Sequence, residues 1–106
     1  MKIVDTQTLN AFLKGPKTPF KKLSGKDISH IVSSAKFRNE RLAHIDLVPI
    51  LNKYDEAKLK RLVTQLGIRW EYFQPHFNQD CLYNSVTHSS SCFPFAGRYC
   101  DPENCS

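Results

Sequence analysis

All four cysteines of this chain lie in its last third, in a stretch without a helical period. Between Cys92 and Cys105 the chain also carries two prolines and a glycine, which interrupt helices and central strands. A segment of this kind holds one conformation only if a metal, disulfides or a packed neighbour restrains it. The sequence therefore predicts an irregular cross-linked tail, residues 75–106, packed on a body formed by residues 1–74 of the same domain.

The histidines and cysteines of the tail have a spacing that suits a structural zinc ion. Tetrahedral zinc takes four nitrogen or sulfur ligands, which are commonly supplied as two local pairs. Disulfides and reduced core thiols are the other interpretations, and an intracellular setting favours metal over disulfides. We therefore predict a zinc site formed by His88, Cys92, Cys100 and Cys105, with Cys81 as the alternative ligand in an all-sulfur set.

Basic residues are concentrated in the body. Residues 1–69 contain 14 Lys and Arg against 6 Asp and Glu, whereas residues 70–106 contain one Arg and four acidic residues. The densest run of lysines lies in a loop over residues 14–26, and a second basic group lies on the predicted helix 55–66. Flexible basic side chains suit contacts with phosphates, although they also serve simply to solvate a surface. The predicted nucleic-acid contacts are Lys14, Lys17, Lys21, Lys22, Lys26, Lys58, Lys60 and Arg61.

Apolar residues recur at helical spacing through the body. Three such runs predict helices over residues 6–14, 25–36 and 55–66, and a fourth, over 40–48, ends at Pro49. Alternation of apolar and charged residues over 68–73 predicts a short extended arm. We expect the core to contain Leu9, Phe12, Leu13, Ile28, Ile31, Val32, Leu42, Ile45, Leu59, Leu62, Val63, Leu66 and Trp70.

The expected fold is therefore mostly α: a small single domain of three to four short helices, with the extended arm and the irregular Cys-rich tail. Helices 25–36 and 40–48, joined by a turn over 37–39, have lengths that a helix-turn-helix DNA-binding motif would have. The turn lacks the usual glycine, and Pro49 shortens the second helix. Ordinary helix packing is the better interpretation of this pair.

The segment Asp80–Val86, which reads Asp-Cys-Leu-Tyr-Asn-Ser-Val, resembles the nucleophile segment of ovarian-tumour-type cysteine peptidases. The resemblance implies Cys81 as a nucleophile. The family's glycine before the cysteine is absent, and its catalytic histidine lies far downstream in a longer domain, whereas only His88 follows here. A thiolate nucleophile needs a positioned base, so we predict that the chain is not an enzyme.

No apolar run approaches the roughly 18–20 residues of a membrane span, and the N-terminal residues do not form a signal peptide. We therefore expect a cytoplasmic protein without a membrane partner.

Two binding functions follow from these features. The leading hypothesis is a small intracellular binding protein whose basic body contacts nucleic acid or a nucleoprotein complex. The alternative is a protein-binding inhibitor or adaptor, such as a viral accessory protein, that contacts its partner through Phe93, Phe95 and Tyr99.

Overall fold

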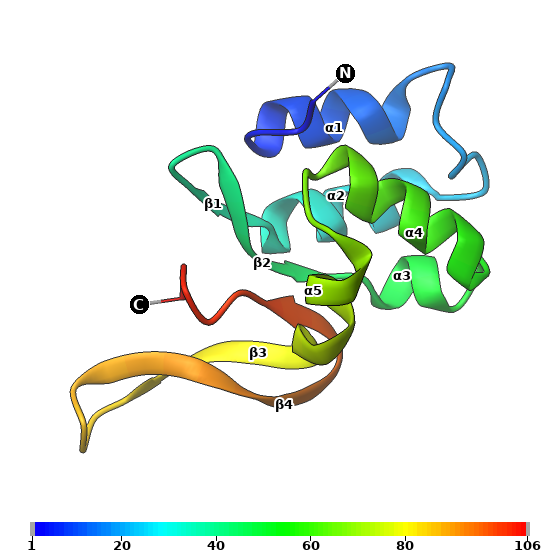
Figure 1. Ribbon diagram of the computed structural model, residues 1–106. Coiled ribbons are helices and arrows are strands. Elements are labelled where there is room, and N and C mark those ends of the chain that lie inside the picture. Colours follow the sequence, from blue (N-terminus) through cyan, green and yellow to red (C-terminus); the bar gives the residue numbers. More distant parts are fainter. Residues whose placement is uncertain (1, 106) are drawn as a thin grey trace.

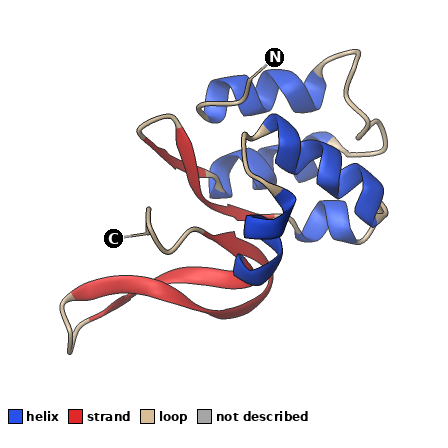
Figure 2. Ribbon diagram, in the orientation of Figure 1, coloured by secondary structure: helices blue, strands red, loops and turns tan. Residues whose placement is uncertain are grey.

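The computed structural model describes residues 2–105, in which a group of helices packs against a small sheet (Figure 1). Figure 2 shows the helices gathered in one half of the molecule and the strands in the other. The elements in chain order are α1 (Thr6–Lys14), α2 (Gly25–Ser34), β1 (Lys36–Arg38), β2 (Arg41–Asp46), α3 (Val48–Leu51), α4 (Glu56–Gln65), α5 (Trp70–His76), β3 (Phe77–Asn84) and β4 (Ser89–Cys100).

The four strands form one antiparallel sheet in the order β1-β2-β4-β3. The C-terminal strand β4 lies beside β2, with His44 opposite Cys100 and Asp46 opposite Arg98. The mostly α prediction is therefore wrong, and the molecule is a mixed α and β domain. The predicted irregular tail is also corrected, because residues 77–100 form a two-stranded hairpin that completes the sheet.

A β-hairpin replaces the predicted helix 40–48, which also removes the helix-turn-helix interpretation. Asn39 and Glu40 connect β1 to β2 with positive φ angles of 52° and 63°, as a two-residue type I′ turn requires. Leu42 and Ile45 are both buried because β2 is a central strand covered on both faces. The three-residue spacing of Leu42 and Ile45 fits one face of a helix, but here it arises because both faces of the strand are buried.

The predicted extended arm over residues 68–73 is also wrong, because a helix begins at Trp70. Trp70 begins the short helix α5, and its ring stacks on Phe73 with the centroids 5.5 Å apart. Phe73 in turn stacks on Tyr99 at 4.9 Å and on Phe77 at 5.1 Å. The conformation of this segment therefore follows the helical spacing of Trp70, Phe73 and Phe77 and not the alternation of apolar and charged residues over 68–73.

The hydrophobic core contains every predicted core residue, either buried or packed against the buried cluster. The helices 6–14, 25–36 and 55–66 are confirmed within one or two residues at their ends, and Asp5 and Ser24 form capping boxes. The core also includes residues that were not on the predicted list, namely Ile3, Phe20, Ala35, Leu47, Ile50, Phe73 and Tyr99. No helix within residues 2–105 has the length and apolarity that crossing a membrane demands.

Gly97 marks the point at which β4 crosses α3. Its φ of +83° lies in the left-handed region, and an added Cβ would overlap the Val48 side chain. Its N–H donates to Asn78 Oδ1 at 2.9 Å, and its carbonyl accepts from the Leu47 N–H at 2.8 Å. The hairpin can approach the helices this closely only because residue 97 has no side chain.

We expect Gly97→Ala to lower the free energy of unfolding by about 2–4 kcal/mol, through backbone strain and overlap with Val48. Urea denaturation measures this value. Gly25→Ala is the matched control, because its Cβ would meet nothing within 4 Å at the start of α2, and it should change stability by less than about 0.5 kcal/mol. Equal effects of the two substitutions would show that the Gly97 crossing does not constrain the fold.

Candidate functional site

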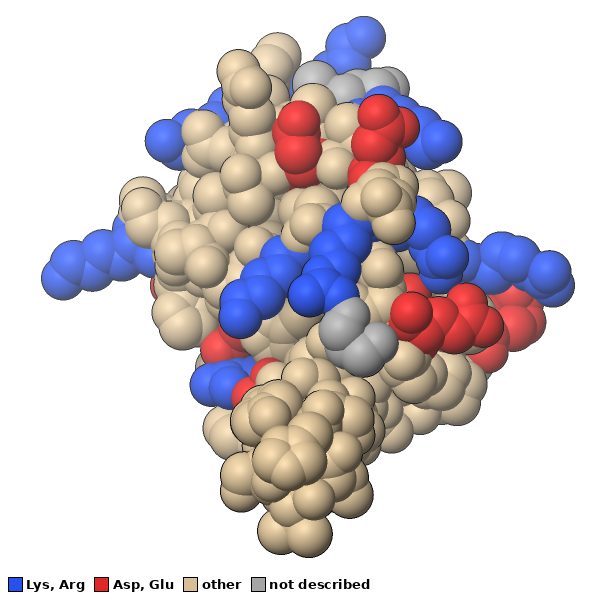
Figure 3. Space-filling model, turned by 90° about the vertical axis from the view of Figure 1, so that its left-hand side faces the viewer, with Lys and Arg blue, Asp and Glu red and all other residues tan. Residues whose placement is uncertain are grey.

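The β3–β4 hairpin projects from the body of the molecule as a two-stranded arm (Figure 1). Residues 82–97 contain no Lys, Arg, Asp or Glu. In the space-filling view of Figure 3 the arm forms the lower part of the surface, without charged side chains on that side. Several large apolar side chains are nevertheless exposed on the arm, namely Leu82, Tyr83, Val86, Phe93 and Phe95.

Strand register divides these side chains between the two faces of the hairpin. Leu82 lies opposite Ser91 and Asp80 lies opposite Phe93, so all four residues belong to one face. Phe95 joins this face because its ring packs 3.9 Å from the guanidinium carbon of Arg98, which also binds Asp80. We call Leu82, Phe93 and Phe95 the apolar face; their exposed fractions are 45%, 39% and 46%.

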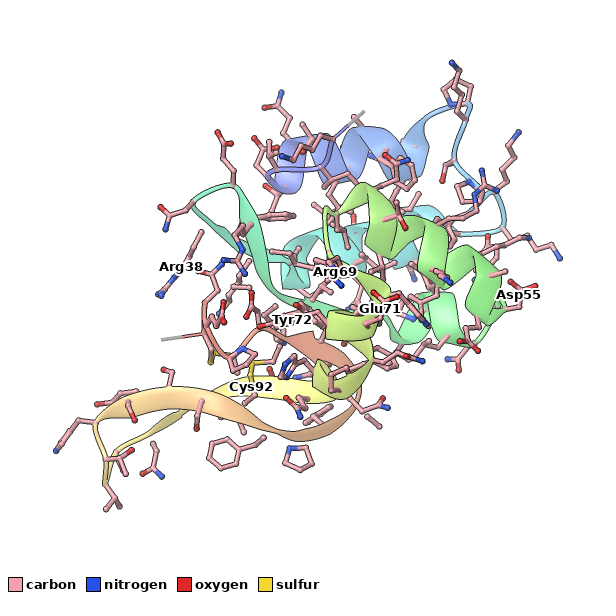
Figure 4. The ribbon with its side chains drawn as sticks, in the orientation of Figure 1. Arg38, Asp55, Arg69, Glu71, Tyr72 and Cys92 are labelled. Atoms are coloured by element: carbon pink, nitrogen blue, oxygen red, sulfur yellow. A yellow bond between two sulfur atoms is a disulfide. The ribbon has the colours of Figure 1, made fainter. Side chains whose placement is uncertain are left out.

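Two disulfides restrain the opposite face of the hairpin. Cys81 and Cys92 lie directly opposite each other but are not joined to each other: Cys81 is joined to Cys105 in the C-terminal segment, and Cys92 to Cys100 at the end of β4. Figure 4 shows the disulfide of Cys92 at the base of the arm. Cross-links that close loops of this length typically stabilise a fold by about 2–4 kcal/mol. The disulfides therefore cross-link the hairpin to the end of β4 and to the C-terminal segment, which lie beside β2.

A network of ion pairs around two buried carboxylates, Asp46 and Asp80, anchors the apolar face. Arg98 Nη1 donates to Asp80 Oδ2 at 2.5 Å, and Arg98 Nε lies 3.5 Å from Asp46 Oδ2, at ion-pair rather than hydrogen-bond distance. His44 Nε2 lies 2.6 Å from Asp80 Oδ1, also without hydrogen-bond alignment. His30 Nε2 contacts Asp46 Oδ2 at 2.9 Å. Because these residues come from α2, β2, β3 and β4, the network ties the arm to the helices.

Asp46 is the central carboxylate of this network. Burial by itself would raise the pKa of Asp46, but the Val48 N–H, His30 and the charge of Arg98 outweigh it and hold the pKa below the ordinary value of 3.8. The Val48 N–H donates to Asp46 Oδ1 at 3.1 Å. Removing one partner from a buried ion pair is costly, because the other charge is left without compensation. The position of the arm therefore depends on charged groups, Asp46, His30 and Arg98, that compensate one another's charges.

The predicted nucleic-acid residues are all on the surface, and Lys58 is the most covered of them. The structure brings part of the two basic groups together, because Lys17 and Arg61 border the same groove between α1 and α4, with a volume of about 390 Å³. Phe20, in the lysine loop, is 1% exposed and packs edge-on against Tyr54. It therefore offers no surface on which a base could stack.

The expected zinc site is corrected by the disulfides, which use all four cysteine sulfurs. The predicted ligand His88 is exposed and lies in the turn between β3 and β4, at the tip of the hairpin. The sulfur atoms of Cys81, Cys100 and Cys105 all lie within 4.8 Å of one another. The sequence therefore identified cysteines that come together, and they are joined in disulfides.

Several residues of the candidate site were not predicted from the sequence. Of the proposed contact residues, Phe93 and Phe95 are exposed, whereas Tyr99 is fully buried. Leu82 and the anchoring residues Asp46, Asp80 and Arg98 were missed. The uncharged run over 82–97, with turn-forming residues between Cys81 and Cys92, was the available signal of a hairpin.

Comparison of the chain with protein-family models, with curated proteins and with solved structures found no match in any of the three.

The anchoring network predicts a pH-dependent contribution of Asp46 to stability. Because its folded-state pKa is lowered, this contribution is present above the unfolded-state pKa and is lost as pH falls through the folded-state value. We expect Asp46→Asn to be less stable than the wild type at about pH 6, and the difference to shrink below about pH 4.

Urea denaturation at a series of pH values checks this prediction. Glu40→Gln, in the exposed β1–β2 turn, serves as the charge-matched control and should follow the wild-type curve throughout. A wild-type advantage over Asp46→Asn that stays constant down to about pH 2 would show that the charge of Asp46 does not stabilise the fold.

Proposed function

We propose that this chain is a non-enzymatic protein-binding module that contacts its partner through the apolar face of the β3–β4 hairpin. The observation that carries the proposal is the exposure of Leu82, Phe93 and Phe95 on one side of an uncharged projecting arm. Exposed apolar residues that cluster on a projecting element are typical of interaction surfaces, whereas scattered ones are not.

The rigidity of the arm supports this function. Two disulfides and the Arg98 network hold its base, so its side chains are largely positioned before a partner arrives. Phe95 in particular is oriented by its contact with the Arg98 guanidinium. Preorganised aromatic residues contribute strongly to binding, because little conformational entropy remains to be lost.

The position of β3 adds a second possibility for contact by the same arm. β3 is the last strand of the sheet, so its outer edge is not paired with another strand of residues 2–105. Edge strands can accept a strand from another protein, with hydrogen bonds along the backbone and pockets for alternate side chains. A partner that adds a strand to β3 would lie next to Leu82.

The disulfides indicate the kind of compartment in which such a module would act. Disulfides persist in oxidising compartments and are rare in a cytosol that keeps thiols reduced. In place of the cytoplasmic setting expected from the sequence, we therefore propose that the protein acts in an oxidising environment, where the partner would also be found.

The test is capture of a partner by the immobilised oxidised protein and by variants of the arm. We expect the triple variant Leu82→Ser, Phe93→Ser and Phe95→Ser to lose at least about tenfold in affinity, since each buried apolar side chain contributes about 1.5–3 kcal/mol. The control, Tyr83→Ser with Val86→Ser, removes exposed apolar residues of the same arm outside the apolar face and should retain the partner.

Nuclease treatment and a salt series separate this mode of binding from nucleic-acid contact. Capture through the apolar face should survive nuclease and change little with salt, because burial of apolar surface is not screened. Equal capture by the triple variant and the wild type would contradict the proposal.

A second candidate function, nucleic-acid binding by the body, is favoured by one specific observation. The groove bordered by Lys17 and Arg61 connects the lysine loop with the basic side of α4, although the two groups are distant in sequence. Two basic residues that border one groove could together contact phosphates of a nucleic-acid backbone.

We expect Lys17→Ala combined with Arg61→Ala to reduce the salt dependence of duplex DNA binding by about 0.9 in log–log slope for each lost phosphate contact. Lys36→Ala, an exposed substitution on β1 outside the groove, should leave the slope unchanged. Binding measured by fluorescence anisotropy over a salt series gives both slopes. An unaltered slope in the double variant would exclude this groove as the contact.

A further inference from the structure

The four cysteines at the base of the hairpin lie close enough together to form disulfides in more than one combination. Cys81 is directly opposite Cys92 in the β3–β4 ladder, although each is joined to another cysteine. Residues directly opposite on antiparallel strands have Cα atoms about 4.5–5.5 Å apart, which is within the range that a disulfide spans. In addition, the sulfur atoms of Cys81, Cys100 and Cys105, which belong to two different disulfides, all lie within 4.8 Å of one another. The geometry therefore permits a second pairing, Cys81 with Cys92 and Cys100 with Cys105.

One of the two disulfides closes a bulge in β4. Strand register places residues 95–98 opposite a single residue of β3, Asn78. The bulge brings the Cα atoms of Cys92 and Cys100 to 5.8 Å from each other, although the two residues are 8 positions apart in sequence. It carries Phe95 of the apolar face. Loss of this disulfide would therefore remove a covalent restraint from the segment that presents the Phe95 ring.

Solvent exposure differs within each disulfide. Cys81 and Cys92 are half-buried, whereas Cys100 is 0% and Cys105 is 7% exposed. Each bond therefore joins a half-buried cysteine to a buried one, so a thiol from solvent attacks at the Cys81 or the Cys92 end. The sulfur that such an attack releases is a buried one, and it lies within 4.8 Å of a sulfur of the other disulfide.

We propose that the two disulfides exchange partners within the folded protein when a small monothiol initiates the reaction. The thiolate of the monothiol bonds to Cys81 Sγ and breaks the Cys81–Cys105 bond, which releases the Cys105 thiolate. This thiolate bonds to Cys100 Sγ, breaks the Cys92–Cys100 bond and releases the Cys92 thiolate. The Cys92 thiolate then bonds to Cys81 Sγ, and the monothiol leaves as its thiolate. The protein is neither oxidised nor reduced overall, and the monothiol is regenerated.

The exchange changes how the arm is restrained. In the second pairing β3 and β4 are joined to each other, so β3 loses its bond to the C-terminal segment and the bulge loses its closing disulfide. Two hydrogen bonds of Gly97 then hold the bulge, from its N–H to Asn78 Oδ1 at 2.9 Å and from the Leu47 N–H to its carbonyl at 2.8 Å. The disulfides thus form a thiol-sensitive switch that sets the rigidity of the arm. This inference does not depend on the function proposed for the apolar face.

The experiment maps the disulfides before and after exposure to a monothiol. The oxidised protein is incubated without oxygen at about pH 8 with a trace of reduced glutathione, because a thiol with a pKa of about 8.5 is partly ionised there. The reaction is stopped with acid and N-ethylmaleimide. Digestion with chymotrypsin and a glutamyl endopeptidase then separates the four cysteines, and mass spectrometry identifies the linked peptides. We expect peptides that link Cys81 with Cys92 and Cys100 with Cys105 to accumulate within hours, at least about tenfold above a thiol-free sample.

The third possible pairing is the internal control. Exchange in the folded protein should not join Cys92 to Cys105, because these residues are neither opposite each other in the ladder nor together in the three-sulfur cluster. Exchange through the unfolded chain would join them, since all three pairings of four cysteines are then accessible. The same incubation in concentrated urea gives this reference. The original pairing alone, or the third pairing in the proportion found in urea, would overturn the proposal.

A variant tests the intramolecular step without an added thiol. Cys105→Ser leaves the Cys81 thiol, whose sulfur position lies within 4.8 Å of Cys100 Sγ. Cys81 should therefore displace one partner of the Cys92–Cys100 bond, and the peptide map should show Cys81 linked to Cys92 or to Cys100. A folded Cys105→Ser protein that keeps only the Cys92–Cys100 bond would contradict the mechanism.

Hydrogen exchange of the isolated second form tests the effect on the arm. The amide hydrogens of Gly97 and Leu47 should exchange at least about tenfold faster than in the original form, because the bulge opens more often. The amide of Leu62, which is buried in α4, is the control and should keep its rate. Equal rates at Gly97 and Leu47 in the two forms would show that the disulfides do not control the arm.

Discussion

The pairing of Arg98 with two buried carboxylates is the interaction on which the arrangement of this molecule depends. Arg98 lies on β4, Asp80 on β3 and Asp46 on β2, so one guanidinium joins three strands of the sheet. The β2–β4 ladder covers only three residue pairs, from His44 opposite Cys100 to Asp46 opposite Arg98. A ladder this short needs side-chain contacts to fix its register, and the buried ion pairs supply them.

The same pairing links the body of the molecule to its exposed surface. One end of the Arg98 side chain is neutralised by Asp80 and Asp46, while the face of its guanidinium supports the ring of Phe95. On the other face of the hairpin, disulfides join Cys81 to Cys105 in the C-terminal segment and Cys92 to Cys100 at the end of β4. The hairpin is therefore restrained on both faces near its base and left exposed toward its tip, as suits an arm that presents apolar side chains.

The two candidate surfaces differ in the physical effect on which binding would depend. The apolar face relies on burial of carbon surface, which is insensitive to salt, whereas the groove bordered by Lys17 and Arg61 relies on release of counterions, which is highly sensitive to salt. Because these effects respond differently to salt and side-chain truncation, the two surfaces can be separated by experiment.

The local pattern of the sequence determined the helices α1, α2 and α4 and all of the predicted core. Their apolar stripes and capping residues act within a few residues, where intrinsic helical preferences are decisive. The sequence also identified the lysines, Phe93, Phe95 and the clustered cysteines as notable. The sequence did not show which of these residues contact one another in the folded protein.

Tertiary structure alone decided the sheet, the disulfides and the anchoring network. Leu42 and Ile45 match a helical spacing, yet β2 is a strand because β4 pairs with it from more than fifty residues away. The pairing of Cys81 with Cys105 and the contact of Arg98 with Asp46 depend in the same way on long-range closure of the chain. Such contacts carry no local periodicity, because their free energy is gained only after distant segments have met.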